Sequence, residues 1–489
     1  MAVTIRPSSW PRRWLLWIAL GLLLRLLFVY FPRTIDDDTW DYLELGRNLI
    51  QHGVYGLGPA NDISPCLFRL PGYPIVLGIV SSIFAPPPSG SWMVALYLFQ
   101  IAVDICSGLL VAAFARRWVG PRAAEVALAL AMLCPFTSAE SATAMTECLS
   151  VFAVALGIYA AGRALSAELA GKRDLPALLL AASAGALAPL LRPDGIILTV
   201  ALAAGLFLYI LRDGPGNWRP ALRRALTSTA IFSLAALLPL AIWTVRNWRT
   251  FHVFQPLAPR ILSDPGERVD VGLHRWYRTW TAEYLSTYNV YWQVDTGHVD
   301  PANLPPRTFD SPDQRARTLA LFDELNRTAT FTASLDERFG ALADERIKAN
   351  PIRYYLWLPA LRAADMLLRP RTEEFRLNIE WWNWRSHPRD SAFALLIGLI
   401  NLAYVLAALW GFLRARVPWP WMLGGYILLR LVLLGTMENP EPRYTIQCFP
   451  ILILAAAAAF ATPKTGSDAV QSHPTAPLPR PAVRKSSSD

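Results

Sequence analysis

The sequence predicts an all-α polytopic membrane protein of about ten transmembrane helices, with an α or mixed domain outside the cytoplasm. Hydrophobic residues make up 54% of the 489 residues and charged residues only 17%, whereas soluble domains usually carry about one quarter charged residues. Several apolar runs reach the roughly 18 residues that a helix needs to cross a bilayer. A polar segment, 246–390, interrupts these runs and is too long for a structureless loop. These observations exclude a soluble globular protein.

The first apolar run, 14–31, predicts an uncleaved span with residues 1–13 in the cytoplasm. As a helix the run is about 27 Å long, and no small-residue cleavage site follows it, so a signal peptide is disfavoured. Arg25 interrupts the run, and we expect its side chain to snorkel to the interface or to find a carboxylate. An acidic stretch, 34–48, then opens a first extracytoplasmic loop over residues 32–70.

Hydropathy predicts ten spans with both termini in the cytoplasm, and the positive-inside rule supports this topology. A transmembrane core covers 14–245, and the last three spans cover 391–461. The Pro-flanked segment 69–85 is expected to form a helix at the outer surface instead. The predicted spans are 14–31, 93–115, 123–135, 148–161, 177–191, 195–211, 225–245, 391–413, 419–436 and 444–461.

The polar segment 246–390 is rich in Trp, Tyr and Arg and should fold as a domain against the outer membrane face. Its aromatic run, 276–292, fits sugar stacking or a membrane-interface belt, and the belt is favoured. The stretch 350–370 predicts an amphipathic surface helix. The Pro-, Ser- and Lys/Arg-bearing tail, 462–489, is expected to be disordered in the cytoplasm.

Polar residues gather at one level of this topology, the outer ends of the spans. Ionisable residues at membrane depth are rare and favour a functional hypothesis. A carboxylate there can act as a general base, and an arginine can bind a phosphate. The set comprises Asp36, Asp37, Asp38, Asp41, Glu147, Arg192, Asp194, Arg246, Asn247, Glu438, Glu441 and Arg443, with Arg25 and Arg430 inside spans.

Several of these residues also have a purely structural interpretation. Asp38 followed by Asp41 fits a helix N-cap with an acidic residue in the first turn. Glu147 at a helix start suits the helix dipole, and Arg192-Pro-Asp-Gly fits a turn. Arg443 next to a tyrosine fits a snorkelling pair at the interface.

Other classes of protein find little support in the sequence. No Walker loop, G-x-G-x-x-G or H-E-x-x-H motif occurs, which disfavours nucleotide-driven and zinc-protease chemistry. The histidines lack ligand spacing, and the five cysteines are expected to be small buried side chains. The excess of Lys and Arg reflects topology, so no nucleic-acid partner is predicted.

Ordered motifs carry a resemblance to a known family. Asp38 is followed four residues later by Tyr42, then by L-x-L-G-R-N-L-I at 43–50 and R-L-P-G-Y-P at 69–74. Further matches are T-E at 146–147, L-R-P-D-G at 191–195, W-T-V-R-N-W at 243–248 and R-Y with proline at 450. The chain resembles GT-C glycosyltransferases, namely bacterial relatives of dolichyl-phosphate-mannose protein mannosyltransferases and of lipid A aminoarabinose transferase (glycosyltransferase family 39-like).

The resemblance implies a multi-pass enzyme of the inner (plasma) membrane whose active site faces away from the cytoplasm. It implies hexosyl or pentosyl transfer from a polyprenyl-phosphate sugar to a lipid, glycan or protein acceptor, with inversion. By position Asp38 is the catalytic carboxylate, with Asp37 as the alternative. The expected substrate-binding residues are Tyr42, Arg69, Glu147, Arg192, Asp194, Arg246, Asn247 and Arg443.

A divalent cation on Asp37, Asp38 and Glu147 would suit the preference of hard cations for carboxylates, but no pattern requires a cofactor. One rival hypothesis is a transporter or lipid flippase. Such proteins place their polar site near the membrane midplane, often between internal repeats. No internal repeat is evident here, and the charges collect at one edge. A non-catalytic scaffold, the second rival, would not need the acidic cluster.

Overall fold

The computed structural model describes residues 12–31, 37–84, 91–415 and 417–461, and the regular secondary structure of this part of the chain is almost entirely helical. Its strands form one short antiparallel pair, β1 (Gly56–Leu57) with β2 (Ser64–Pro65). The predicted all-α class is confirmed. The tail 462–489 and most of the predicted cytoplasmic N-terminus lie outside the described residues.

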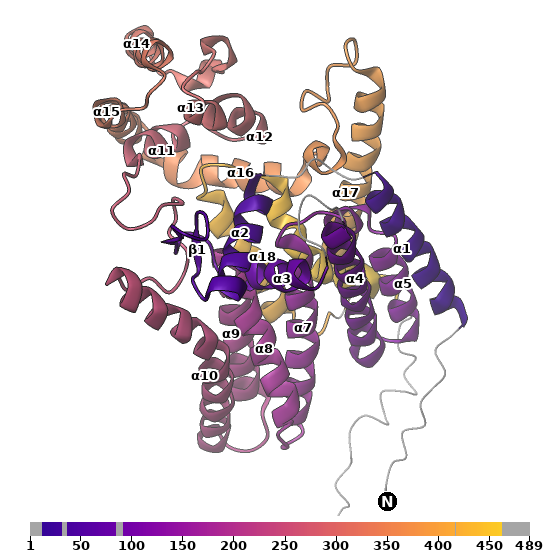
Figure 1. The fold of residues 1–489 in the computed structure, drawn as a ribbon. Helices are drawn as coiled ribbons and strands as arrows, with labels where there is room; N and C mark the ends of the chain where they lie inside the picture. Colours follow the sequence, from indigo (N-terminus) through magenta and orange to yellow (C-terminus); the bar gives the residue numbers. More distant parts are fainter. Residues whose placement is uncertain (1–11, 32–36, 85–90, 416, 462–489) are drawn as a thin grey trace, which may run out of the picture.

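Each of the ten predicted spans coincides with an apolar helix (Figure 1). Among the described residues, six helices are long and apolar enough to cross a membrane, or seven if a pair bent by 52° counts as one span. The remaining predicted spans are shorter helices, so the count of ten stays a prediction. The six are α1 (Arg12–Tyr30), α4 (Ser91–Trp118), α7 (Glu147–Leu169), α9 (Ile196–Asp213), α10 (Trp218–Phe251) and α17 (Pro388–Arg414).

The bent pair consists of α5 (Pro121–Met132) and α6 (Pro135–Ser141). Pro135 has no N–H to continue the helical ladder, so the chain changes direction there. The shorter apolar helices are α8 (Leu175–Leu191), α18 (Pro420–Gly435) and the 3-10 turn η7 (Pro442–Cys448) that runs into α19 (Phe449–Ala458). A short 3-10 turn, η1 (Pro193–Gly195), links α8 to α9.

Helices α7 to α10 contact one another as a bundle, which Figure 1 shows below α2 and α3. Many of the buried residues on α7 and α8 are alanines, and small residues let helix backbones approach closely in a membrane. Four of the five cysteines are buried as expected, and Cys106 is exposed.

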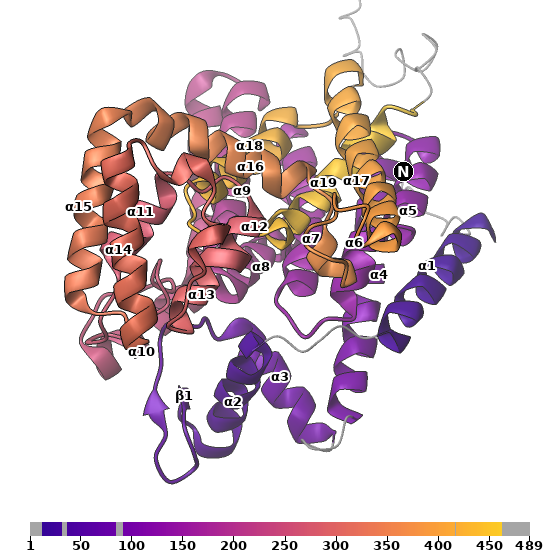
Figure 2. The same ribbon diagram turned by 90° about the horizontal axis from the view of Figure 1, so that it is seen from above.

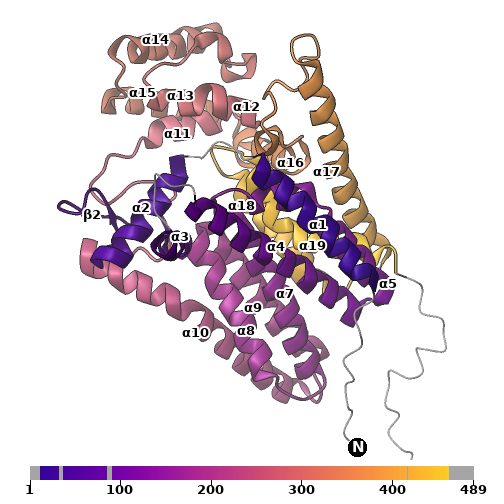
Figure 3. The same ribbon diagram turned by 45° about the vertical axis from the view of Figure 1, so that its right-hand side comes forward.

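Arg25 on α1 is fully buried and finds a carboxylate, which is one of the two outcomes expected from the sequence. Its Nη2 lies 2.5 Å from Asp104 Oδ2 of α4, and its Nη1 donates to the carbonyl oxygen of Met132 at the end of α5. In Figure 3, α1 lies in front of α4 and α5, the helices that supply these partners. The charge is therefore compensated inside the bundle rather than at the interface.

The first loop forms α2 (Asp37–His52) and α3 (Gly72–Ile83), which lie side by side (Figure 2). The helix predicted within 69–85 is thereby confirmed. Their backbones nearly touch, because a Cβ on Gly46 would lie 1.9 Å from the Pro74 carbonyl oxygen. The predicted N-cap role of Asp38 is wrong, since α2 already begins at Asp37 and Asp38 lies inside its first turn.

The polar segment after α10 folds into short helices with their own hydrophobic core. The helical stretch predicted over 350–370 is confirmed as a π-helical turn, η5 (Arg353–Trp357), that runs into α16 (Leu358–Leu368). A 3-10 turn, η6 (Thr372–Phe375), follows. The preceding helices are α11 (Val271–Arg278), α12 (Tyr284–Ser286), η2 (Thr287–Tyr291), α13 (Trp292–Asp295), η3 (Pro301–Asn303), η4 (Pro306–Thr308), α14 (Pro312–Thr328) and α15 (Ala333–Ala349).

The favoured belt interpretation of the aromatic run 276–292 is wrong for its first members. Trp276, Tyr277 and Trp280 are almost completely buried and pack with Phe322 and Phe339 in the core of this helical domain. Large aromatic side chains serve equally well as a core or as a belt. Only the tertiary fold decides between these roles.

Candidate active site

Asp38 and Arg69 form the first half of a polar site at the end of the bundle where α2 and α3 lie. Arg69 precedes α3, and its Nη2 donates to Asp38 Oδ1 at 2.5 Å and to Asp41 Oδ2 at 3.3 Å. Its guanidinium also lies 5.2 Å from the centre of the Tyr42 ring. Spacings of three and four residues put Asp38, Asp41 and Tyr42 on one face of α2. Three residues predicted from the motifs therefore converge.

A second arginine reaches Asp38 from the far end of the chain. Arg443 Nη2, on η7, lies 3.9 Å from Asp38 Oδ2, and Arg443 Nε lies 2.7 Å from Glu441 Oε2. Tyr444 donates its hydroxyl to the other oxygen of Glu441 at 2.6 Å. Asp38 thus lies between two guanidinium groups that are distant in sequence.

The second half of the site is a row of alternating charges on α7, η1 and α18. Arg192 Nη1 donates to Glu147 Oε1 at 2.6 Å, and Arg192 Nε donates to Asp194 Oδ1 at 3.2 Å. Arg430 Nη2 donates to Asp194 Oδ2 at 2.7 Å and to Gln447 Oε1 at 2.9 Å. Glu147 is fully buried, so the pairing with Arg192 offsets the loss of its hydration.

Tyr444 joins the two halves into one structure. The Arg192 guanidinium lies 4.7 Å from the centre of the Tyr444 ring. The Tyr444 carbonyl oxygen accepts hydrogen bonds from Arg430 Nε and Nη2. The sequence suggested only an interfacial tyrosine here, because tertiary contacts are not visible in the R-Y pair. We call the whole set the ion-pair network: Asp38, Asp41, Arg69, Glu147, Arg192, Asp194, Arg430, Glu441, Arg443 and Tyr444.

Burial and neighbouring charges shift several pKa values in the first half of the site. Burial raises the pKa of Asp41, and Arg69 opposes this shift. Burial also raises the pKa of Tyr42 to about 12. Burial alone would lower the pKa of Arg69, but Tyr42, Asp38 and Asp41 outweigh it and raise that pKa. Arg69 is therefore a permanent cation in this site.

Arg246 and Asn247 were expected to bind substrate, but the structure does not bring them to the ion-pair network. Arg246 donates to the carbonyl oxygens of Cys66 and Tyr55, each at 2.7 Å. Asn247 is buried and donates to the Gln255 carbonyl oxygen. Through these hydrogen bonds both residues instead connect α10 to the first loop and to the chain that follows α10. Residue type alone does not reveal this role.

The remaining predictions concern Asp36, Asp37 and a metal ion. Asp36 and the Asp37 side chain lie outside the described residues. Within the described ranges, no group of three or more His, Cys, Asp or Glu side chains is arranged to hold a metal ion. Asp38 and Glu147 are each engaged by arginines, so these residues do not fit a cation site in this conformation.

The resemblance seen in the motifs is confirmed by a family model that matches part of the chain. Residues 69–243 match the family model described as dolichyl-phosphate-mannose-protein mannosyltransferase. This range includes Arg69, Glu147, Arg192 and Asp194, whereas Asp38 and Arg443 lie on either side of it. No curated protein matches the chain.

Two solved structures are similar at low identity. ArnT from Cupriavidus metallidurans, bound to undecaprenyl phosphate, is 16% identical with a TM-score of 0.40, over 91% of this chain and 77% of ArnT. The archaeal oligosaccharyltransferase AglB from Archaeoglobus fulgidus, with an inhibitory peptide and a dolichol-phosphate, is 11% identical with a TM-score of 0.45, over 92% of this chain and 50% of AglB.

Proposed function

We propose that the protein transfers a hexosyl or pentosyl group from a polyprenyl-phosphate sugar to an acceptor hydroxyl, with inversion, on the extracytoplasmic face of the inner membrane. The observation that carries the proposal is the position of Asp38 between Arg69 and Arg443. A carboxylate flanked by two guanidinium groups combines a proton acceptor with groups that bind a phosphate. The matched family is named for a dolichyl-phosphate sugar, which supports a lipid-phosphate donor.

The reaction is a single displacement. Asp38 accepts the proton of the acceptor hydroxyl while the hydroxyl oxygen attacks C1 of the sugar. The bond between C1 and the phosphate oxygen breaks, and the polyprenyl phosphate leaves with the electron pair. Attack from the face opposite the leaving group inverts C1. The developing phosphate charge is met by arginine side chains, which stabilise it without reorganisation.

Donor binding and base release are coupled in this arrangement. Arg69 and Arg443 are paired with carboxylates in the structure. The phosphate of the lipid-linked sugar therefore competes with those carboxylates for the guanidinium N–H groups. An arginine that turns to the phosphate leaves more of the Asp38 carboxylate open to the acceptor hydroxyl. Donor binding therefore increases the access of the acceptor to the proposed base.

The position of the network suits a donor held by its lipid in the bilayer. Glu147 begins α7, Arg192 follows α8, and Arg443 lies in η7, which runs into α19. All three lie at ends of apolar helices, the depth at which a lipid phosphate sits. The acceptor is a lipid, glycan or protein hydroxyl that reaches the same level from outside.

The test uses purified protein in proteoliposomes, radiolabelled polyprenyl-phosphate sugars and a membrane extract as the source of acceptors. Asp38→Asn should lower transfer by at least about 100-fold, since general-base catalysis contributes roughly that much. Asp62→Asn, which removes an exposed acid from the same loop, is the matched control and should transfer normally. Full transfer by Asp38→Asn would exclude Asp38 as the base, and the labelled product identifies the acceptor.

A further inference from the structure

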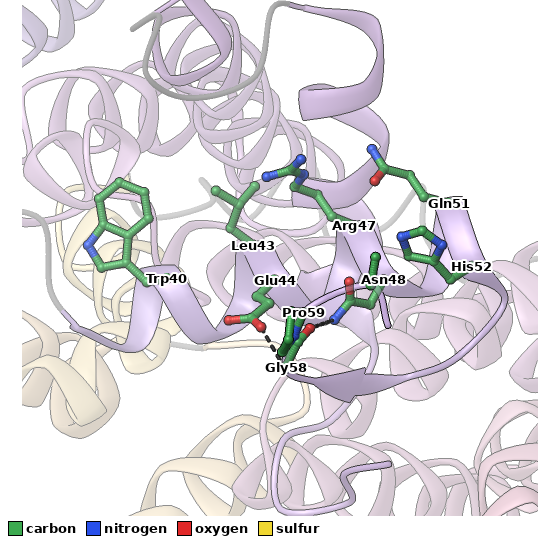
Figure 4. Close-up of a pocket in the computed structure, with 10 residues that line it drawn as sticks. Trp40, Leu43, Glu44, Arg47, Asn48, Gln51, His52, Gly58 and Pro59 are labelled. Carbon is green, nitrogen blue, oxygen red and sulfur yellow. Dashed lines mark hydrogen bonds between the residues drawn. The ribbon is translucent and has the colours of Figure 1, made fainter. Parts of the chain in front are cut away.

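A groove of about 420 Å³ lies along α2, between this helix and the turn that contains Gly58 (Figure 4). At 3.6 residues per turn, Trp40, Arg47 and Gln51 share a helix face that is roughly opposite Asp38. We call this hollow the α2 groove. It is lined by Trp40, Leu43, Glu44, Arg47, Asn48, Gln51 and His52 of α2 and by Gly58, Pro59 and Ala60 of the facing turn.

One wall of the groove is fixed by hydrogen bonds between α2 and the turn. Glu44 Oε1 accepts from the Gly58 backbone N–H at 2.7 Å, and Asn48 Nδ2 donates to the carbonyl oxygens of Gly56 and Gly58. Gly58 has a φ of +110°, and a Cβ there would lie 2.4 Å from the Asp62 carbonyl oxygen. The hollow is thus formed by specific local geometry.

Arg47 is the unusual member of the lining. Within the described part of the chain its guanidinium makes no hydrogen bond or ion pair, and its Nε is buried without a partner. The arginines of the ion-pair network are all paired with carboxylates or backbone oxygens. A buried donor without a partner is unfavourable. A ligand carboxylate or phosphate is what a planar guanidinium fork binds best.

The other residues that line the α2 groove indicate what kind of molecule carries the anionic group. Trp40 leaves 43% of its surface exposed, and its flat ring can stack on the apolar face of a sugar. The Gln51 amide and the His52 ring are exposed and provide hydrogen-bonding groups for hydroxyls. We propose that the α2 groove binds an anionic saccharide, meaning a sugar that bears a phosphate or a carboxylate. This site is separate from the proposed transfer reaction.

The test measures saturation-transfer NMR on the full-length protein in lipid nanodiscs, with glucose 6-phosphate, glucuronate and glucose as probes. The wild type should bind both anionic sugars and bind glucose about tenfold more weakly, the factor expected for one charge-assisted contact. Arg47→Gln should lower the affinity for the anionic sugars to that for glucose, and Arg47→Lys should retain part of it. Trp40→Leu should weaken the binding of all three sugars.

Matched controls keep the proposal falsifiable. Arg249→Gln removes an exposed arginine elsewhere and should bind like the wild type, as should Asp38→Asn. Wild-type binding by Arg47→Gln, or loss of binding in Asp38→Asn, would overturn the assignment. Displacement by inorganic phosphate at the same concentration as glucose 6-phosphate would also overturn it, because the sugar would then contribute nothing. A glycolipid with a carboxylated headgroup, added to the nanodiscs, shows by displacement whether lipid-borne saccharides reach the groove.

Discussion

The Arg192 guanidinium lies 4.7 Å from the centre of the Tyr444 ring, and this stack joins two rows of charges that would otherwise be separate. On one side Tyr444 donates to Glu441, which holds Arg443 near Asp38. On the other side Arg192 pairs with Glu147. One aromatic residue therefore sets the distance between the proposed base and the buried row of the site.

Tyr444→Phe and Tyr444→Leu separate the two contributions of this residue. The Phe variant keeps the ring below Arg192 but removes the donor to Glu441, so transfer should fall about tenfold. The Leu variant also loses the cation–π contact and should fall further, by about another tenfold. Initial transfer rates are compared with those of Tyr288→Phe, an exposed tyrosine whose variant should be normal. Equal rates for the Phe and Leu variants would show that the ring contributes nothing.

The pair formed by Arg25 and Asp104 should behave as a single unit in unfolding experiments. Arg25→Met leaves Asp104 buried beside no cation, which should destabilise the protein by about 3–5 kcal/mol. Asp104→Leu should destabilise the protein by a similar amount. The double variant should lose much less stability than the sum of the two single losses. Thermal unfolding in detergent of all four proteins completes the cycle. Additive losses would contradict the direct pairing.

Asp365 on α16 predicts a pH-dependent stability. Burial raises its pKa to about 6, against the opposing effect of Arg369, so the folded protein holds this proton more tightly than the unfolded chain. Folding stability should then decrease as the pH rises from about 4 through 6, by at most about 3 kcal/mol. Asp365→Asn, which cannot ionise, should unfold at a higher temperature than the wild type at pH 8 and at a similar temperature at pH 4.

The matched control for this experiment is Asp323→Asn, which removes an exposed acid on α14. Its unfolding temperature should follow that of the wild type at both pH values. If Asp365→Asn lowers the unfolding temperature at pH 8, the Asp365 carboxylate stabilises the fold and the sign of the argument is wrong.

Gly46→Ala tests the close approach of α2 and α3. Its Cβ would lie 1.9 Å from the Pro74 carbonyl oxygen, a contact that only a shift of the helix relieves. Because Asp38 lies on α2 and Arg69 directly precedes α3, this shift should separate them and lower transfer by at least about tenfold. Gly425→Ala adds a methyl group to open space and should be silent. Normal transfer by Gly46→Ala would show that the helices tolerate the displacement.

Sequence patterns predicted the helices of this protein better than the contacts of its charged side chains. Apolar runs and helix spacing are local properties, so the helices and the shared face of Asp38 and Tyr42 followed from them. The tertiary fold determines which residues form ion pairs. Nothing near Arg25 in the sequence indicates Asp104, which lies 79 residues away. For the same reason Arg246 and Asn247 matched their motif yet bind backbone carbonyls of other segments.

The burial of Arg25 also sets an order for the biogenesis of the protein. The partners of its guanidinium come from α4 and α5, which emerge from the ribosome after α1. Until then an isolated α1 carries an arginine facing lipid, a penalty of roughly 2.5–3.5 kcal/mol for insertion at the centre of a helix. The hydrogen bonds of Arg25 with α4 and α5 therefore form only after those helices have been synthesised.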